Sequence, residues 1–169
     1  MANHFLKNIK ALVLAGLFFK GNDADSIYRQ GLDLLIREIE EQVLDDGMHF
    51  ERSPMYHVAM LSDMLDMYVA IEQCGKEAPG SLGAACRKMT HFLNRIVHPD
   101  GEVPFLNDST ESFFIKTPEV LQRGLTLFPE TSEAEAQPET INPDRHSGLL
   151  VHSDDRMHLV FDAGNVGPD

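Results

Sequence analysis

The sequence predicts a mainly α-helical protein, an incomplete α/α toroid of helical hairpins followed by a C-terminal β-hairpin. Apolar residues recur at helical spacing through most of residues 1–128. Two Asp-Gly turns, Asp46-Gly47 and Asp100-Gly101, each follow a pair of such segments. The helical-hairpin pattern therefore repeats after roughly fifty residues, a period typical of stacked or circular helical arrays. The last residues instead alternate apolar and polar side chains, which is typical of strands.

The first predicted hairpin joins residues 3–19 to residues 25–44. The second half of the first segment is apolar nearly all round, as in a buried helix. Gly21-Asn22-Asp23 then ends this helix and caps the next one. Residues 25–44 carry one apolar stripe with acidic residues on the opposite face, and Asp45-Asp46-Gly47 turns the chain.

Three more helices are predicted, over residues 54–73, 81–97 and 117–127. Pro54 suits the first turn of a helix. The four methionines of residues 54–73 are interpreted as core filling, with a flexible binding face as the alternative. His98-Pro99-Asp100-Gly101 ends the fourth helix.

Beyond these helices the composition changes. Residues 129–146 hold three prolines and several acids, and they are interpreted as a loose linker. Residues 148–153 and 157–163 are predicted to form a β-hairpin around Asp154-Asp155, and an isolated hairpin is only marginally stable in water. The predicted organisation is a partial toroid over 1–128, a linker over 129–146 and a hairpin over 147–169.

Composition narrows the classes of function. The 169 residues carry a formal net charge of −13, which argues against general binding to nucleic acid or anionic membranes. No apolar run reaches membrane-spanning length, so no membrane insertion is expected. Cys74 and Cys86 do not make a disulfide framework and lack metal-ligand spacing. The histidines also lack such spacing, and we predict no metal site in this chain.

Two polar clusters open two of the predicted helices. Asn3-His4 begins the first helix, and Ser53-Pro54-Met55-Tyr56-His57 follows the first Asp-Gly turn. Because the loops after equivalent helices of a helical ring lie at the same end, we expect these clusters to meet in one site. His4, Lys7, His49, Arg52 and His57 would make that site locally positive on an acidic protein.

Asn-His at a helix start, with Ser-Pro-x-Tyr-His later, resembles the helical domain of heparinase II/III-type polysaccharide lyases. This resemblance covers most of the chain. It implies β-elimination from uronic-acid-containing glycans, so the expected partner is an acidic polysaccharide or oligosaccharide. It also implies further helices before Asn3 and a β-sandwich after the hairpin, where relatives often place a metal and another proton-transfer histidine. By this comparison the chain is expected to be a piece of a larger enzyme, inactive in isolation and without a cofactor of its own.

β-Elimination requires neutralisation of the substrate carboxylate, removal of the neighbouring proton and protonation of the leaving oxygen. The resemblance assigns the first role to Asn3 and His4, and proton transfer to Tyr56. Arg52 suits a carboxylate or sulfate through its bidentate guanidinium, and His57 is a candidate substrate contact. Each residue also has a structural alternative: a helix cap, a core tyrosine, an ion pair or a helix face turned away from the site.

Two other functions remain open from the residues. A glycoside hydrolase needs two opposed carboxylates, and Glu51 and Asp108 follow the two turns in equivalent places. A non-catalytic glycan-binding helical domain is the other alternative. Oligomeric state cannot be inferred from this pattern.

Overall fold

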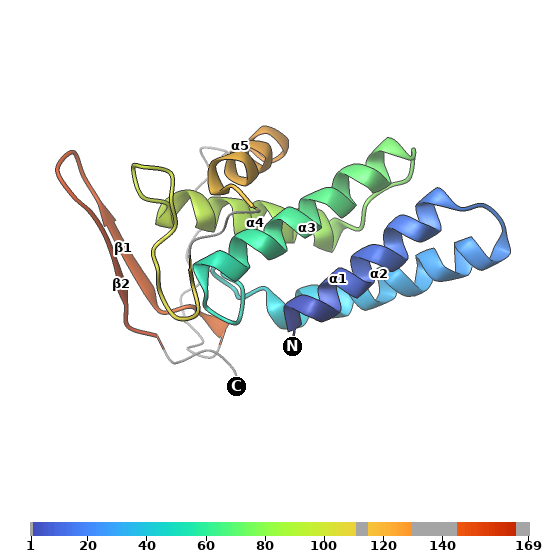
Figure 1. Ribbon diagram of the computed structural model, residues 1–169, viewed down its shortest axis with the longest axis horizontal. Coiled ribbons are helices and arrows are strands. Elements are labelled where there is room, and N and C mark those ends of the chain that lie inside the picture. The colour runs from blue at the N-terminus through green and yellow to red at the C-terminus, as the bar shows by residue number, and fades with distance from the viewer. Residues whose placement is uncertain (1, 111–114, 130–144, 165–169) are drawn as a thin grey trace.

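The computed structural model describes residues 2–110, 115–129 and 145–164. In chain order its elements are α1 (Ala2–Phe18), α2 (Asn22–Gln42), α3 (Pro54–Gln73), α4 (Gly80–Ile96), α5 (Thr117–Leu127), β1 (Leu149–Ser153) and β2 (His158–Asp162). Helices α1 and α2 form one antiparallel pair and α3 and α4 a second (Figure 1). The two pairs pack through α1 and α3, and α5 lies across α4. The predicted mainly α class of helical hairpins followed by a β-hairpin is confirmed.

The α1–α2 pair packs closely because a glycine faces a helix backbone. At Gly16 of α1, an added Cβ would lie 2.7 Å from the Cα of Tyr28 in α2. Only a residue without a side chain permits that approach. Helix α1 packs against both α2 and α3, and its apolar residues Leu6, Ile9 and Val13 are fully or almost fully buried.

The α3–α4 pair contains the most buried part of the core. Met60, Met64 and Met67 of α3 are completely or almost completely buried and belong to one continuous apolar cluster. The interpretation of these methionines as core filling is therefore confirmed. Met55, one turn earlier, is half-buried.

The two loops that follow the Asp-Gly turns pack against each other. The side-chain amide of Asn107 donates a hydrogen bond to the carbonyl of Arg52 at 2.7 Å. The backbone N–H of Met55 donates to the hydroxyl of Ser109 at 3.1 Å. Ser53, the N-cap residue of α3, makes no capping bond of its own, so the second loop caps the helix that carries Tyr56.

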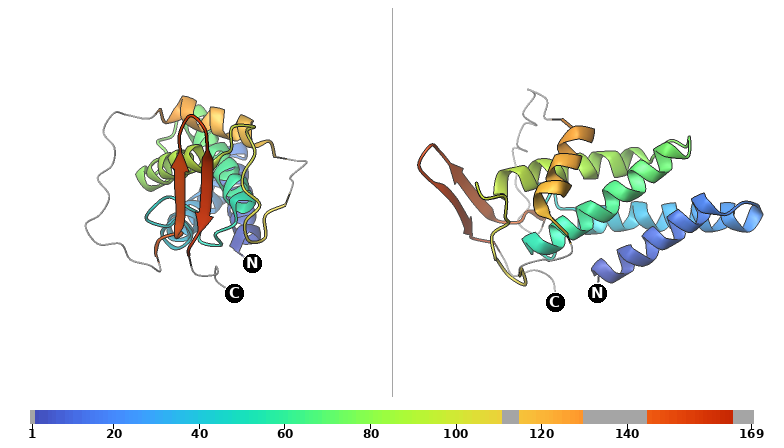
Figure 2. Two further views of the ribbon diagram at one scale, coloured as in Figure 1. Left: turned by 90° about the vertical axis from the view of Figure 1, so that its left-hand side faces the viewer. Right: turned by 45° about the horizontal axis from the view of Figure 1, so that its top comes forward.

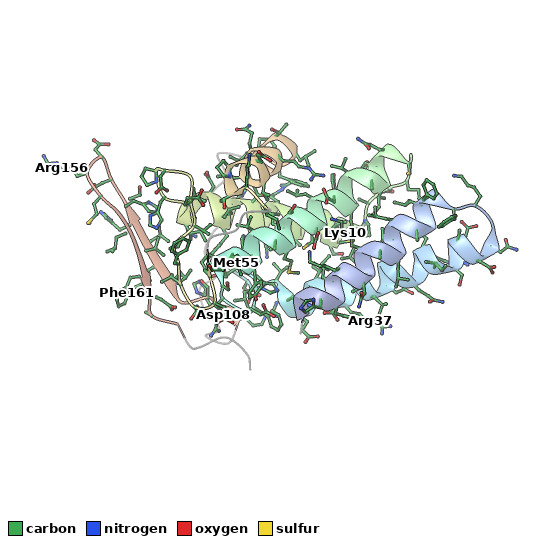
Figure 3. All side chains as sticks on the ribbon, in the orientation of Figure 1. Lys10, Arg37, Met55, Asp108, Arg156 and Phe161 are labelled. Atoms are coloured by element: carbon green, nitrogen blue, oxygen red, sulfur yellow. The ribbon has the colours of Figure 1, made fainter. Side chains whose placement is uncertain are left out.

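The β-hairpin stands across one end of the helices (Figure 2). Leu149 pairs with Asp162 and Ser153 with His158, in antiparallel register. Its base is tied to the end of α2, where Arg145 donates to the carbonyls of Glu40 and Val43, both at 2.9 Å. Arg156 marks the tip of the hairpin in Figure 3.

The observed bounds match the predicted ones for α3 and α5. They begin one to three residues earlier than predicted for α1, α2 and α4. Residues 130–144 of the predicted linker lie outside the described residues. Among the described helices, none combines the length and apolar character needed to cross a membrane.

Candidate functional site

A cavity of about 300 Å³ opens between α1, α3 and the segment that leads into α5. Helix α1 contributes His4 and Lys7, and α3 contributes Tyr56. The third wall comes from the second Asp-Gly loop and includes Phe105. The lining is mostly apolar with a few polar groups, which is the usual character of a small-molecule or sugar-binding pocket.

His4 and Tyr56 lie in this same cavity although they are far apart in the sequence. His4 is exposed in the first turns of α1, and Tyr56 is half-buried in the first turn of α3. The cavity therefore holds an imidazole and a phenol, two groups that transfer protons or donate hydrogen bonds. Asn3 belongs to α1, but its side chain lies outside the described part of the chain.

His57, the residue after Tyr56, points into the protein instead. Its side chain is completely buried, and it is not among the described residues that line the cavity. The backbone N–H of His49 donates to its Nδ1 at 3.2 Å, and its Nε2 lies 3.0 Å from the carbonyl of Met89. These partners fit a neutral ring protonated at Nε2, which donates to Met89.

Two buried imidazoles are thus held neutral beneath the site. Burial lowers the pKa of His57 to about 4, although the Met89 carbonyl and Asp46 oppose the shift. Burial, with a contribution from His57, lowers the pKa of His49 to about 3. Both residues act as packing and hydrogen-bonding groups here, so we do not carry His57 forward as a substrate contact.

Arg52 is also buried, and it lies outside the described lining of the cavity. Its Nη2 donates to the carbonyl of His146 at 3.3 Å, next to the base of the hairpin. Its backbone is left-handed, with φ of 55°, and the equivalent loop has Asn107 at 52°. Arg52 therefore links the two loops and the hairpin base.

Glu51 and Asp108, the two carboxylates of the glycosidase alternative, lie near each other. Burial raises the pKa of Glu51, and the Asp108 charge reinforces this effect while His4 opposes it. Neither carboxylate is among the described residues that line the cavity. The cavity thus presents an imidazole and a phenol, and not this pair of carboxylates.

A ladder of charges joins the three helices beside the cavity. Asp63 of α3 accepts from Lys7 at 2.9 Å and from Lys10 at 2.8 Å. Lys10 also pairs with Asp66 at 2.5 Å, and Asp66 pairs with Arg123 of α5. Figure 3 shows Lys10 between α1 and α3. Burial opposes the charge of Lys10, but the hydrogen bonds and charges of Asp63 and Asp66 outweigh it and raise the pKa of Lys10.

Sequence reasoning missed part of this wall. Asp63, Glu102 and Phe105 line the cavity, and Phe105 is 64% exposed. The echo between the two loops was the available signal for residues 102–108. It led to Asp108 instead, because that carboxylate is the counterpart of Glu51 in the first loop.

Comparison with known proteins agrees with the resemblance. The model of the family described as heparinase II/III N-terminus matches residues 1–135.

The chain belongs to this family.

A heparin-sulfate lyase of Pedobacter heparinus is 36% identical over 110 residues, which are 63% of this chain and 17% of that protein. The FtsZ-localized protein C of Caulobacter vibrioides is 25% identical over 170 residues, which are 96% of this chain and 27% of that protein. The crystal structure of heparinase III matches with a TM-score of 0.65 at 22% identity, over 76% of this chain and 21% of that one. The chain therefore shares its fold with part of heparinase III. The chain spans less than a third of each of these proteins.

Proposed function

We propose that the protein is, or forms part of, a polysaccharide lyase that cleaves uronic-acid-containing glycans by β-elimination. One observation carries the proposal: His4 and Tyr56 line one cavity in a member of the heparinase II/III family. The name of the Pedobacter relative, heparin-sulfate lyase, favours a sulfated uronate polymer as the substrate class.

In the proposed reaction Asn3 and His4 neutralise the substrate carboxylate. Donors aimed at the carboxylate stabilise the negative charge that develops when the neighbouring proton leaves. Tyr56 exchanges protons with the sugar carbon or the leaving oxygen. A phenol has a reference pKa of about 10, so it acts readily as an acid and as a base only where cations lower that value.

The test is the ultraviolet absorbance of the unsaturated sugar ends that β-elimination creates. The chain and the full-length product of its gene are incubated with sulfated and unsulfated uronate polymers. We expect absorbance to grow with the full-length product. If the phenol is the proton-transfer group, the rate of this growth should be about 10²–10⁴-fold lower for Tyr56→Phe. Equal turnover by Tyr56→Phe and the native protein would remove Tyr56 from the mechanism.

A second candidate function is kept because the Caulobacter relative, whose match covers 96% of this chain, is named for localisation with FtsZ and not for a lyase activity. The alternative is a glycan-binding module without turnover. In that case glycan binding persists in Tyr56→Phe and no polymer yields unsaturated ends from any version of the protein.

A further inference from the structure

Lys7 stands out among the described residues that line the cavity because none of the others is a lysine or an arginine. It lies three residues after His4 on α1. Residues at this spacing share a helix face, with Cβ atoms about 5–6 Å apart. The ammonium and the imidazole therefore lie beside each other on the α1 side of the cavity.

Asp63 forms two ion pairs, with Lys7 and with Lys10, and it can lose the pair with Lys7 without becoming unpaired. Lys7 contacts Oδ2 at 2.9 Å, while Lys10 contacts Oδ1 at 2.8 Å. If Lys7 swings away, the carboxylate of Asp63 keeps a cation on its other oxygen. The penalty of leaving a buried charge unpaired does not arise.

The exposure of the two lysines also indicates that Lys7 is the one that can leave Asp63. The Lys7 side chain is 55% exposed, against 22% for Lys10 and 12% for Asp63. Because more than half of the Lys7 side chain is exposed, water weakens its attraction to Asp63, and another anion can replace that carboxylate at little cost.

The charges of the ladder do not balance. Lys7, Lys10 and Arg123 face two carboxylates, Asp63 and Asp66. The surplus is one positive charge, and the most exposed cation of the network is the one at the cavity. Lys7 thus presents a cation to the cavity, although the same lining also holds the carboxylates of Asp63 and Glu102.

We infer that Lys7 is a second anion contact of the cavity, binding a sulfate or carboxylate on the sugar beside the one held at His4. The inference rests on the proposed function for the kind of glycan, and it adds that neighbouring anionic groups are recognised together. Lys7 binds the substrate and takes no part in proton transfer, so its removal affects KM and leaves kcat nearly unchanged.

The experiment compares native protein, Lys7→Gln, Lys7→Arg and Lys20→Gln. Lys20 is an exposed lysine just after α1 and serves as the matched loss of one charge. Binding by the chain is measured calorimetrically with three oligosaccharides of equal length, one heparin-derived, one oligogalacturonate and one neutral. Turnover by the full-length gene product is followed by ultraviolet absorbance.

For Lys7→Gln we expect about tenfold weaker binding of an anionic oligosaccharide, the scale of one hydrogen bond to a charged group. Lys7→Arg should keep most of the affinity, and Lys20→Gln and the neutral sugar should show no change. The difference should fade at high salt, because exposed charges are screened. Loss for the heparin-derived ligand alone identifies sulfate, whereas loss for both anionic ligands identifies carboxylate.

Equal affinities of Lys7→Gln and Lys20→Gln for both anionic oligosaccharides would overturn the inference, and so would a native chain that binds neither. Unsaturated ends produced equally well by Lys7→Gln, with unchanged KM, would refute the inference and leave the lyase standing. Weaker anion binding by Lys7→Gln in a protein that makes no unsaturated ends would refute the lyase and leave the anion site standing.

Discussion

Acidification from pH 7 to pH 5 should destabilise this protein through the buried rings of His49 and His57. In the folded state their pKa values are about 3 and about 4, against 6.5 for a free ring. Between the folded pKa and 6.5, each ring is therefore protonated in the unfolded chain and neutral in the folded protein, so protonation favours the unfolded state. The contribution of each ring to stability is complete above pH 6.5 and is lost as the pH falls towards the folded pKa.

The magnitude follows from the two pKa values of each ring. Between pH 7 and pH 5 the loss is about 2 kcal/mol for each histidine by linkage. At pH 5 both rings are still mostly neutral in the folded protein, so their effects add to about 4 kcal/mol. Protonation of His57 would also place a hydrogen on Nδ1 against the N–H of His49, which now donates to that atom.

Urea unfolding at the two pH values, followed by circular dichroism, measures the effect. With a slope of about 2 kcal/mol per molar urea, the midpoint should fall by about 2 M. A double variant, His49→Gln with His57→Gln, should be less stable at pH 7 and should lose most of this pH dependence. Equal midpoints at pH 7 and pH 5 in the native chain would refute the reasoning, as would ring signals that titrate near pH 6.5 by NMR.

Two further substitutions, measured by urea unfolding, test the packing that places the site. Gly16→Ala should destabilise the chain by about 2 kcal/mol, because its Cβ would meet the backbone of Tyr28. Gly83→Ala is the control: its Cβ would have no neighbour closer than 3.5 Å, so this change should be neutral or stabilising. Ser109→Ala removes the hydroxyl that caps α3 and should cost about 1 kcal/mol by the same assay, while Ser109→Thr keeps a hydroxyl and should cost less; equal losses for both would argue against the cap.

The parts of the fold that were predicted correctly have local causes. Pro54 and the Asp-Gly turns limit the chain through backbone geometry alone, so the bounds of α3 follow from adjacent residues. The hairpin likewise follows from alternation around a turn, in which Asp154 accepts from the N–H groups of Arg156 and Met157. Family resemblance supplied what periodicity could not, namely the roles assigned to His4 and Tyr56.

The contacts that sequence reasoning missed are set by tertiary packing. His57 is next to Tyr56 in sequence, and contacts from other segments, with the carbonyl of Met89 in α4 and the N–H of His49, make it a buried structural ring. Lys7 and Asp63 are 56 positions apart, and no helical period relates them. A polar residue beside a candidate site therefore has two possible roles, and the neighbouring helix decides between them.

The cavity wall is assembled from α1, α3 and the segment 102–117, which are far apart in the sequence. The contacts that span it, from Lys7 to Asp63 and from Met55 to Ser109, bridge 56 and 54 positions. Closing loops of that length costs chain entropy before the contacts form, so these contacts form more slowly than a helical turn does. A chain that has all its helices but lacks these contacts would still lack the cavity. Ligand capture would thus report native assembly more sensitively than helical content, and it offers a stringent criterion for refolded material.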